Sequence, residues 1–542
     1  MPLQFLNMIK NRASQMAYSS TLYDWSLRGY TPERLIVRPP DCWVGDVDRG
    51  RALFDGVLMH EGESLPLAQC GWMPLGITQP WIRHVHGFTW LRDLRSLSCE
   101  KGMGADARRA ARAMIQSWLS YYRHWDKDAW APEVTGHRLS MWLGHYEFYG
   151  QFEGDDDEAD RFEHVFFDAA VRQARHLSHV FSQKNSDPRD IGHFSAAKGL
   201  LYAGIAFEGH EAWIDVALNE IERAIEGQIA GDGSHRSRSP QALLDVLKTL
   251  LDIRMALQSA DYPMPEKIQH AIDKMGPALR FFRYNDKGLG LFNGAQEGDR
   301  DVLDSVMRQC GIRGKAMSSL PCAGFERIVH GRTTIVMDTG KAGEYVSHHG
   351  PLAFEMNYGR QRVFVNCGHH PLDEDWQDAL SACPAHTSIT LDSRNPLVGK
   401  ASYSSREDHK NATLLEAAHE GYVALNGFTH KRRLYVSDQG QDIRGEDSLT
   451  AQHDPQRPIE AVIRFHLHPK VMVSLIREGQ EALLRLPGGV GWRFHHSGGE
   501  LALEDSVYLG EGKQIRKTKQ LAIYGQITQK QARILWAVQR EG

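Results

Sequence analysis

The motif SHRSRSP, which precedes a long helical pattern, gathers the side chains best suited to acid–base chemistry on an acidic substrate. Arg236 and Arg238 can each bind a carboxylate through two parallel hydrogen bonds. His235 can exchange a proton near neutral pH. Ser239 and Pro240 are also typical of a helix start, as cap and first helical residue. The motif is therefore either a site for a carboxylate-bearing ligand or a solvated turn before a helix.

Two other groups of histidines are candidates for chemistry. His466 and His468 in RFHLHP alternate along a predicted strand, so their side chains share one face, as two metal ligands would. Every strand repeats in this way, so core packing is the commoner explanation. His430 stands close to Arg432 and Arg433 in THKRRL. That basic group favours a charged sheet surface, with ligand binding as the alternative.

The composition indicates a globular chain of several domains. Its 542 residues suggest two to four domains; 42% are hydrophobic and 24% charged. The net charge of −5 lacks the basic character of a nucleic-acid-binding protein, so no nucleic acid partner is predicted. The apolar runs are too short to span a bilayer, so no membrane partner is predicted either. Composition gives no indication of the oligomeric state.

The cysteines and the start of the chain bear on the compartment. The seven cysteines are scattered and form no C-x-x-C pair, which argues against a disulfide framework. The first twenty residues lack the apolar core of a secretory signal. We therefore expect a reduced, cytoplasmic protein, with a periplasmic location as the alternative.

Apolar spacing predicts helices through the first half of the chain and strands through the second. The predicted helices cover residues 108–123, 136–149, 160–180, 196–207, 212–229, 240–258 and 265–282. From about Phe325 the apolar period becomes two, and roughly a dozen strands with turn residues between them predict an antiparallel sandwich. The predicted domains are therefore a helical domain over 1–285, a linker rich in Gly, Asn and Asp over 286–320, and a β-domain over 321–542.

Several stretches resemble the heparinase II/III-like polysaccharide lyases. In the first half they are HGFTWLRDLRSL (86–97), PEVTGHRLSMWL (132–143) and DGSHRSRSPQALLDVLKTLLDI (232–253). In the second half they are HHGPLAFEMNYGRQRVFVNCG (348–368), ALSACPAHTSITLDS (379–393), GEDSL (445–449), RFHLHP (464–469) and LEDSVYLG (503–510). The resemblance implies an N-terminal (α/α) toroid, an incomplete α/α barrel, followed by a C-terminal antiparallel β-sandwich. It also implies β-elimination on a uronic-acid polysaccharide in a cleft between toroid and β-domain.

The resemblance suggests catalytic residues and shows where this chain departs from the family. A uronate lyase must neutralise the C6 carboxylate, remove the C5 proton and protonate the departing O4. His193, His235 and Arg238 match positions of the family's catalytic region, but Ala242 stands where a tyrosine is expected. Tyr146 could replace that tyrosine as an acid or base.

Other residues are candidates for binding the glycan. Arg236 and Arg83 could bind its carboxylates, while His145 could face the same groove. Trp90 is one of many aromatic residues in the first half on which a sugar ring could stack, although most of these belong in the helical core.

The family's β-domain carries a metal, and the resemblance places its ligands here at His348, Asn366 and His386. Asn366 stands where Asp is expected, and Val346 stands where the family has an additional histidine. Because zinc prefers His, Cys and carboxylate ligands, the asparagine lowers the expected affinity, although His349, His369 and His370 could compensate. The alternative is a hydrogen-bonded polar cluster beneath the sheet.

Three functions are compatible with these residues. The first is a lyase that cleaves an acidic polysaccharide, with zinc as a possible cofactor. The second is a carbohydrate-binding or assembly protein that keeps the lyase fold without the chemistry, which Ala242 and Val346 favour. The third is a hydrolase, which would need two carboxylates across a cleft.

Overall fold

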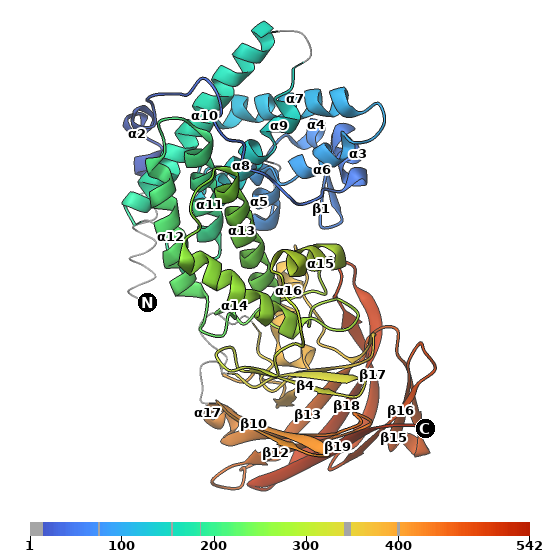
Figure 1. Ribbon diagram of the computed structural model, residues 1–542. Helices are drawn as coiled ribbons and strands as arrows, with labels where there is room; N and C mark the ends of the chain where they lie inside the picture. Colours follow the sequence, from blue (N-terminus) through green and yellow to red (C-terminus); the bar gives the residue numbers. More distant parts are fainter. Residues whose placement is uncertain are drawn as a thin grey trace. The chain divides into compact units, whose positions relative to one another are not determined.

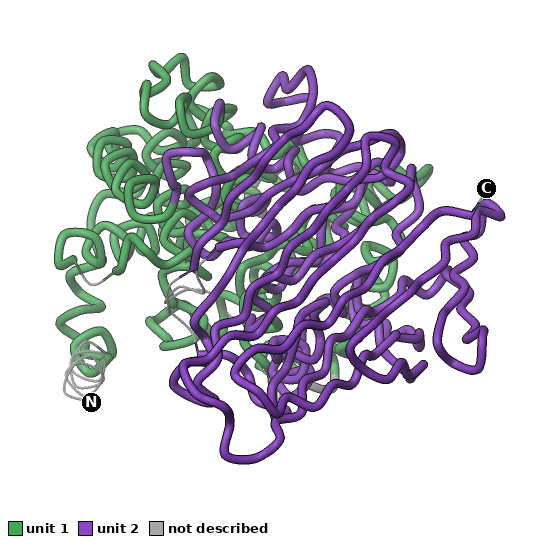
Figure 2. The backbone as a smooth tube through the Cα atoms, turned by 90° about the horizontal axis from the view of Figure 1, so that it is seen from below, with its two compact units in different colours: residues 1–228, 246–272 green, residues 229–245, 273–542 purple. Residues whose placement is uncertain are grey.

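The structure is a computed structural model that describes residues 15–73, 76–152, 156–184, 186–340, 348–397 and 402–541. Val346 lies outside these residues. The chain forms two compact units (Figure 2). Unit 1 comprises Met1–Gln228 and Val246–Ile272, and unit 2 comprises Ile229–Asp245 and Asp273–Gly542.

Unit 1 is helical, as predicted (Figure 1). Its longer helices are α5 (Gln79–Gly87), α7 (Gly104–Tyr122), α8 (Pro132–Gly144), α10 (Asp156–Ser182), α11 (Gly192–Ala206) and α12 (Ala212–Gln228). Shorter elements are α2 (Thr21–Ser26), α3 (Val47–Phe54), α4 (Leu67–Cys70), α6 (Leu91–Leu97), α9 (Tyr146–Tyr149) and the hairpin β1 (Val57–His60) and β2 (Glu63–Pro66). The helices α13 (Pro240–Ser259) and α14 (Glu266–Phe282) contribute residues to both units.

The helix predicted over residues 136–149 is instead two helices. It begins four residues earlier, at Pro132, and α8 ends at Gly144; His145 caps it with a backbone N–H bonded to the Met141 carbonyl before α9 begins. Every residue of α11 is buried, which makes α11 the central helix of unit 1. Its small residues allow α8 to approach closely, because a Cβ at Gly199 would lie 2.5 Å from Cα of Gly136.

Buried histidines make unit 1 sensitive to acid. Burial lowers the pKa of His86 and of His176 to about 3 and that of His145 to about 4. In an unfolded chain these imidazoles titrate near 6.5, so below that pH the unfolded state binds protons that the folded state does not. The free energy of unfolding should therefore fall by up to about 1.4 kcal/mol per pH unit for each histidine between pH 6.5 and 4.

Urea denaturation followed by tryptophan fluorescence tests this expectation. We expect the stability at pH 5.0 to lie at least about 2 kcal/mol below that at pH 7.5. Equal stability at the two pH values would mean that these imidazoles take up protons without unfolding.

Unit 2 is an antiparallel β-sandwich, also as predicted. Its largest sheet has the order β14-β15-β16-β19-β12-β11-β10-β9, with the strands β9 (Ser402–His409), β10 (Ala412–Tyr422), β11 (Phe428–Ser437), β12 (Asp442–Thr450), β14 (Met472–Ile476), β15 (Glu481–Arg485), β16 (Gly491–Ser497) and β19 (Gln531–Arg540). Burial alternates along β11, as expected for a strand with one face in the core.

Two smaller sheets complete the sandwich. One has the order β17-β18-β13-β8, with the strands β8 (Ile389–Leu391), β13 (Ile459–His466), β17 (Glu500–Tyr508) and β18 (Arg516–Ile527). The other runs β3-β4-β5-β6-β7, with the strands β3 (Ser319–Leu320), β4 (Phe325–His330), β5 (Thr333–Asp338), β6 (Phe354–Tyr358) and β7 (Gln361–Phe364). The core contains stacked aromatic rings, among them Phe354 against Trp536 at 5.3 Å between centroids.

The segment predicted to be a linker is an ordered part of unit 2. It contains α15 (Arg300–Gln309), and Leu289, Leu291 and Phe292 are at most 3% exposed. Its glycines form turns rather than a flexible connection; Gly294, for example, has a φ of +79°. The motif SHRSRSP also belongs to unit 2, whereas the prediction placed it in the helical domain.

Candidate functional site

His235 is held in a hydrogen-bonded turn at the start of α13. Its side chain is nearly buried, and both the Ser237 hydroxyl, at 2.7 Å, and the Ser237 backbone N–H, at 3.2 Å, contact its Nδ1. Burial and the nearby Arg236 lower the pKa of His235 to about 4, so the ring is neutral at pH 7. Because Nδ1 accepts the backbone N–H, the ring proton lies on Nε2. His235 is therefore arranged as a hydrogen-bond donor through Nε2.

The two arginines of this loop differ in what they can do. Arg238 has a φ of +60° and is 8% exposed, and its guanidinium forms an ion pair with Asp338 and donates to the Ala323 carbonyl at 2.6 Å. These contacts fix the loop and leave Arg238 poorly suited to the catalytic role predicted for it. Arg236 is half-buried, so part of its side chain is open to a ligand carboxylate.

The three residues predicted to bind a metal lie together in unit 2. Nδ1 of His348 is 3.2 Å from Nε2 of His386, and Nδ1 of His386 is 3.2 Å from Oδ1 of Asn366. Since the amide oxygen can only accept, the His386 proton lies on Nδ1, and its Nε2 accepts from Nδ1–H of His348. This chain of bonds places the ring proton of His348 on Nδ1 and leaves a lone pair on its Nε2.

A turn at Asn293 and Gly294 joins this cluster to the loop of His235. Asn293 donates from Nδ2 to the Arg238 carbonyl at 3.1 Å. A Cβ at Gly294 would lie 3.7 Å from both Nε2 of His348 and Nδ1 of His369. We call His235, Arg236, His348, His369 and His386 the histidine site. Asn293 and Gly294 were not predicted as part of a site, because an Asn-Gly turn in a predicted linker gives no signal of one.

The histidine site fits zinc poorly. Two imidazole nitrogens 3.2 Å apart could share an ion, but Asn366 turns its oxygen to the other nitrogen of His386 and carries no charge. Among the described residues, no group of three His, Cys, Asp or Glu side chains could hold a metal. A neutral pair of ligands lacks the anionic or third histidine ligand of ordinary zinc sites. The zinc cofactor stays a prediction.

Replacing Asn366 by Asp should create the missing charge. Asn366 is fully buried, so we expect Asn366→Asp to lower the melting temperature when no metal is present, because a buried carboxylate without a cation is costly. Zinc should restore that temperature in the variant and leave the natural chain almost unchanged. A zinc-induced shift of equal size in both proteins, measured by calorimetry, would instead show that the natural site already binds the ion.

His430 and His466, on two strands of the β-domain, have structural partners. His466 donates from Nε2 to the Pro384 carbonyl and accepts at Nδ1 from the Ser506 hydroxyl, both at 2.8 Å. Nε2 of His430 bonds to Asp447 at 2.7 Å. Both rings are buried. The predicted charged surface around His430 is therefore a buried ionic network, because the alternation of β11 turns His430 and Arg432 inward.

The remaining candidate residues lie in unit 1, where most are buried. Trp90 is 1% exposed and packs against Phe88 at 4.7 Å between ring centroids, which leaves no face for a sugar. Tyr146 is 5% exposed, and its hydroxyl donates to Glu163. Burial and Glu163 raise the pKa of Tyr146, so it is unsuited to replace the family's tyrosine. The predicted roles of both residues do not fit this packing.

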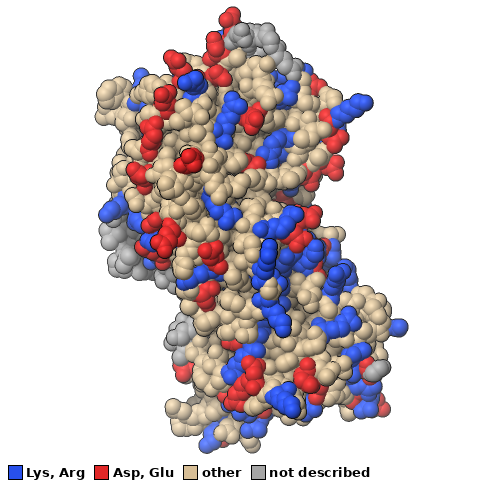
Figure 3. All heavy atoms as spheres, in the orientation of Figure 1, with Lys and Arg blue, Asp and Glu red and all other residues tan. Residues whose placement is uncertain are grey.

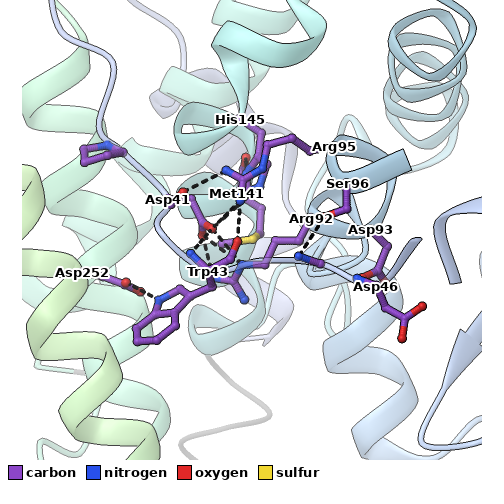
Figure 4. A network of polar contacts seen from close by, with 12 residues as sticks. Asp41, Trp43, Asp46, Arg92, Asp93, Arg95, Ser96, Met141, His145 and Asp252 are labelled. Atoms are coloured by element: carbon purple, nitrogen blue, oxygen red, sulfur yellow. Dashed lines mark hydrogen bonds and ion pairs between the residues drawn. The ribbon is translucent and has the colours of Figure 1, made fainter. Parts of the chain in front are cut away.

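His145 belongs to a buried ionic network rather than a groove. Its Nδ1 donates to the Met141 carbonyl at 3.0 Å, and its Nε2 lies 3.9 Å from Asp41. Figure 4 shows Asp41 at the centre of this network, with Arg92 turned toward it. The network ties the segment before α3 to α6 and the end of α8.

His193 and Arg83 each have an acidic partner in unit 1. Nε2 of His193 lies 3.0 Å from Glu220, and the ring is 3% exposed. Nε of Arg83 donates to Glu133 at 2.9 Å, and half of the arginine side chain is exposed. Arg83 is thus the predicted binding residue of unit 1 that solvent reaches.

Family models match nearly four-fifths of the chain. The model described as Heparinase II/III N-terminus matches residues 111–311, and Heparinase II/III-like, C-terminal matches 312–537. The chain belongs to the heparinase II/III-like family. Among the described residues of this family member, no helix is both long and apolar enough to cross a bilayer.

Individual relatives support the same fold. FtsZ-localized protein C from Caulobacter vibrioides is 27% identical over 527 residues, which cover 92% of this chain and 88% of that protein. The crystal structure of a heparinase III superposes with a TM-score of 0.75 at 12% identity, covering 98% of this chain and 91% of that one. Heparan sulfate lyase HepC from Pedobacter heparinus gives 0.62 at 14% identity, covering 91% and 82%. The heparinase-like chain thus has the fold of the polysaccharide lyases.

Proposed function

We propose that this protein binds a uronate-containing polysaccharide at the histidine site and cleaves it by β-elimination. The observation that carries the proposal is the Asn293–Gly294 turn, which joins the loop of His235 and Arg236 to His348 and His369. Membership of the heparinase II/III-like family supports this reaction class.

Each residue of the site has a separate role in the elimination. Arg236 binds the C6 carboxylate of the uronate, which makes the C5 proton more acidic. The lone pair on Nε2 of His348 takes that proton, the C4–C5 double bond forms and the C4–O4 bond breaks. Nε2–H of His235 donates a hydrogen bond to the departing O4 and stabilises the charge that develops there, while water supplies the proton that O4 takes up. The base and the hydrogen-bond donor therefore differ because their hydrogen bonds fix different ring tautomers.

Ultraviolet absorbance of the new C4–C5 double bond tests this function. Purified protein is incubated with a panel of uronate polysaccharides, and the rise in absorbance is followed. We expect His235→Ala to lower the rate by roughly 100-fold or more, because a positioned hydrogen-bond donor to a developing oxyanion contributes about 10²–10³. His453→Ala, at an exposed position of unit 2, is the matched control and should keep the full rate.

A second candidate function is glycan binding or assembly without cleavage. Ala242 favours it, since a methyl group cannot transfer a proton where the family is expected to carry tyrosine. The similarity to a protein named for localisation with FtsZ also favours it. A flat absorbance trace together with measurable glycan binding that Arg236→Ala weakens would select this function over the lyase.

A further inference from the structure

A basic groove of about 1130 Å³ lies on unit 2, away from the residues of the histidine site. Its walls come from the end of α14, from α15, from the segment that follows α15 and from β4. Figure 3 shows Lys and Arg side chains gathered in this region. We call it the basic groove and define it by Arg280, Arg308, Arg313, Lys315 and Arg327.

Carboxylates compensate only part of this charge. Asp304 pairs with Arg283 and, at 2.7 Å, with Lys287, which line the groove as well. Asp301 is the other acidic residue in its lining. Within the described parts of the chain, no ion pair is found for the five residues that define the groove. The groove therefore carries a concentrated positive field, although the chain as a whole has a net charge of −5.

Arg327 gives an independent sign that an anion belongs here. It is 6% exposed, and its Nη1 donates to the Phe281 carbonyl at 2.6 Å. Its Nε is buried and has no acceptor among the described residues. A buried N–H of a charged group without an acceptor is costly, and an anionic oxygen bonded to it would remove that cost.

The other residues that line the groove indicate which class of molecule carries the anionic group. Apolar side chains stand among the cations: Met307, Ile312 and Val329, of which Val329 is 54% exposed. Tyr284, the aromatic residue of the lining, is 3% exposed and bonds to Glu355 at 3.0 Å. Nucleobases and sugar rings therefore find no exposed ring on which to stack. A peptide offers both carboxylates and apolar side chains.

We propose that the basic groove binds an acidic peptide segment of a partner protein, in which apolar residues alternate with Asp and Glu. The carboxylates pair with the arginines, Arg327 included, and the apolar side chains pack on Met307, Ile312 and Val329. This binding does not depend on the proposed lyase function, because the two sites share no residues.

Fluorescence anisotropy of the full chain with two labelled peptides of equal negative charge tests this proposal. One peptide alternates Glu with Leu, and the other alternates Glu with Ser. We expect the Glu-Leu peptide to bind several-fold more tightly and its affinity to fall with salt. The double variant Arg308→Glu, Arg313→Glu should weaken it about tenfold or more. Lys517→Glu, Lys530→Glu changes the charge equally at exposed positions outside the groove and should keep the affinity within about twofold.

Competition decides between classes of ligand. If heparin or single-stranded DNA binds the groove more tightly than the Glu-Leu peptide, and the groove variant loses that binding, the peptide assignment is overturned. Failure of both peptides to bind, or equal binding by the groove variant, overturns it as well. Arg327→Met, judged folded by its melting temperature, should weaken the Glu-Leu peptide without reversing any surface charge.

Discussion

Asp447→Ala is expected to lower the free energy of unfolding of unit 2 by about 3–5 kcal/mol, because it leaves a buried guanidinium without its counterion. Asp447 and Arg432 are 1% and 0% exposed, and Nε of Arg432 donates to the carboxylate at 2.8 Å. His430, at 2.7 Å, and Nε1 of Trp536, at 2.9 Å, bond to the same carboxylate. Three buried groups on the two strands that flank β12 therefore depend on this one carboxylate.

The same substitution should impair the histidine site. Nη1 of Arg432 donates to the carbonyls of Leu352, at 2.7 Å, and Thr387, at 2.6 Å. Thr387 follows His386 directly, and Leu352 lies four residues after His348. Asp447 thus acts on the site through Arg432, as a positioning residue.

Urea denaturation and glycan binding of the variant check both effects. Asp442→Ala on the same strand is the control: its ion-pair partner Arg444 is 62% exposed, and pairs that solvent reaches contribute about 0–1 kcal/mol. If Asp447→Ala and Asp442→Ala cost the same, the buried network is not what stabilises unit 2. Asp447→Asn should lose less stability than Asp447→Ala, since the amide keeps one acceptor.

Gly136→Ala is expected to destabilise unit 1 by about 3 kcal/mol or more, through overpacking of backbone against backbone. A Cβ at Gly136 would lie 2.1 Å from the Ser195 carbonyl oxygen and 2.4 Å from Cα of Ala196. Neither atom belongs to a flexible side chain, so α8 and α11 must move apart. Because α11 is buried along its whole length, that movement disturbs packing on all of its sides.

Gly144→Ala, in the same helix, is the matched control. Its Cβ would meet side-chain and backbone atoms at 3.5–3.7 Å, which is ordinary contact. Alanine also favours helix over glycine by up to about 1 kcal/mol. Thermal denaturation should therefore show a large loss for Gly136→Ala and little change, or a gain, for Gly144→Ala. Equal melting temperatures would mean that the helices separate at little cost.

The sequence predicted most elements well because periodicity is a local property. Apolar spacing placed α10, α11, α12, α13 and α14 with ends that differ from the structure by at most four residues. It failed at His145, where a backbone turn divides one apolar pattern into two helices. It also failed over residues 286–320, where glycine and asparagine form turns within unit 2.

The local sequence pattern did not predict how deeply single side chains are buried or which residues they bond to. Trp90, His145 and Tyr146 have the chemistry of binding or catalytic residues, and only the packing around them shows that each is enclosed. The sequence suggests that Arg238 binds a ligand carboxylate, but in the structure its guanidinium forms an ion pair with Asp338, one hundred residues away. These partners are far away in the sequence, and the spacing of residue types along the chain does not predict such long-range contacts.

The sequence by itself determined the family resemblance, the change from helices to strands and the set of histidines and arginines available for chemistry. Only the tertiary structure decided which of them meet. His348, Asn366 and His386 converge, and the Asn293–Gly294 turn joins them to the loop of His235, because strands far apart in the chain pair in one sandwich. The basic groove arises in the same way: charges that are dilute along the sequence become concentrated when α14, α15 and β4 pack together.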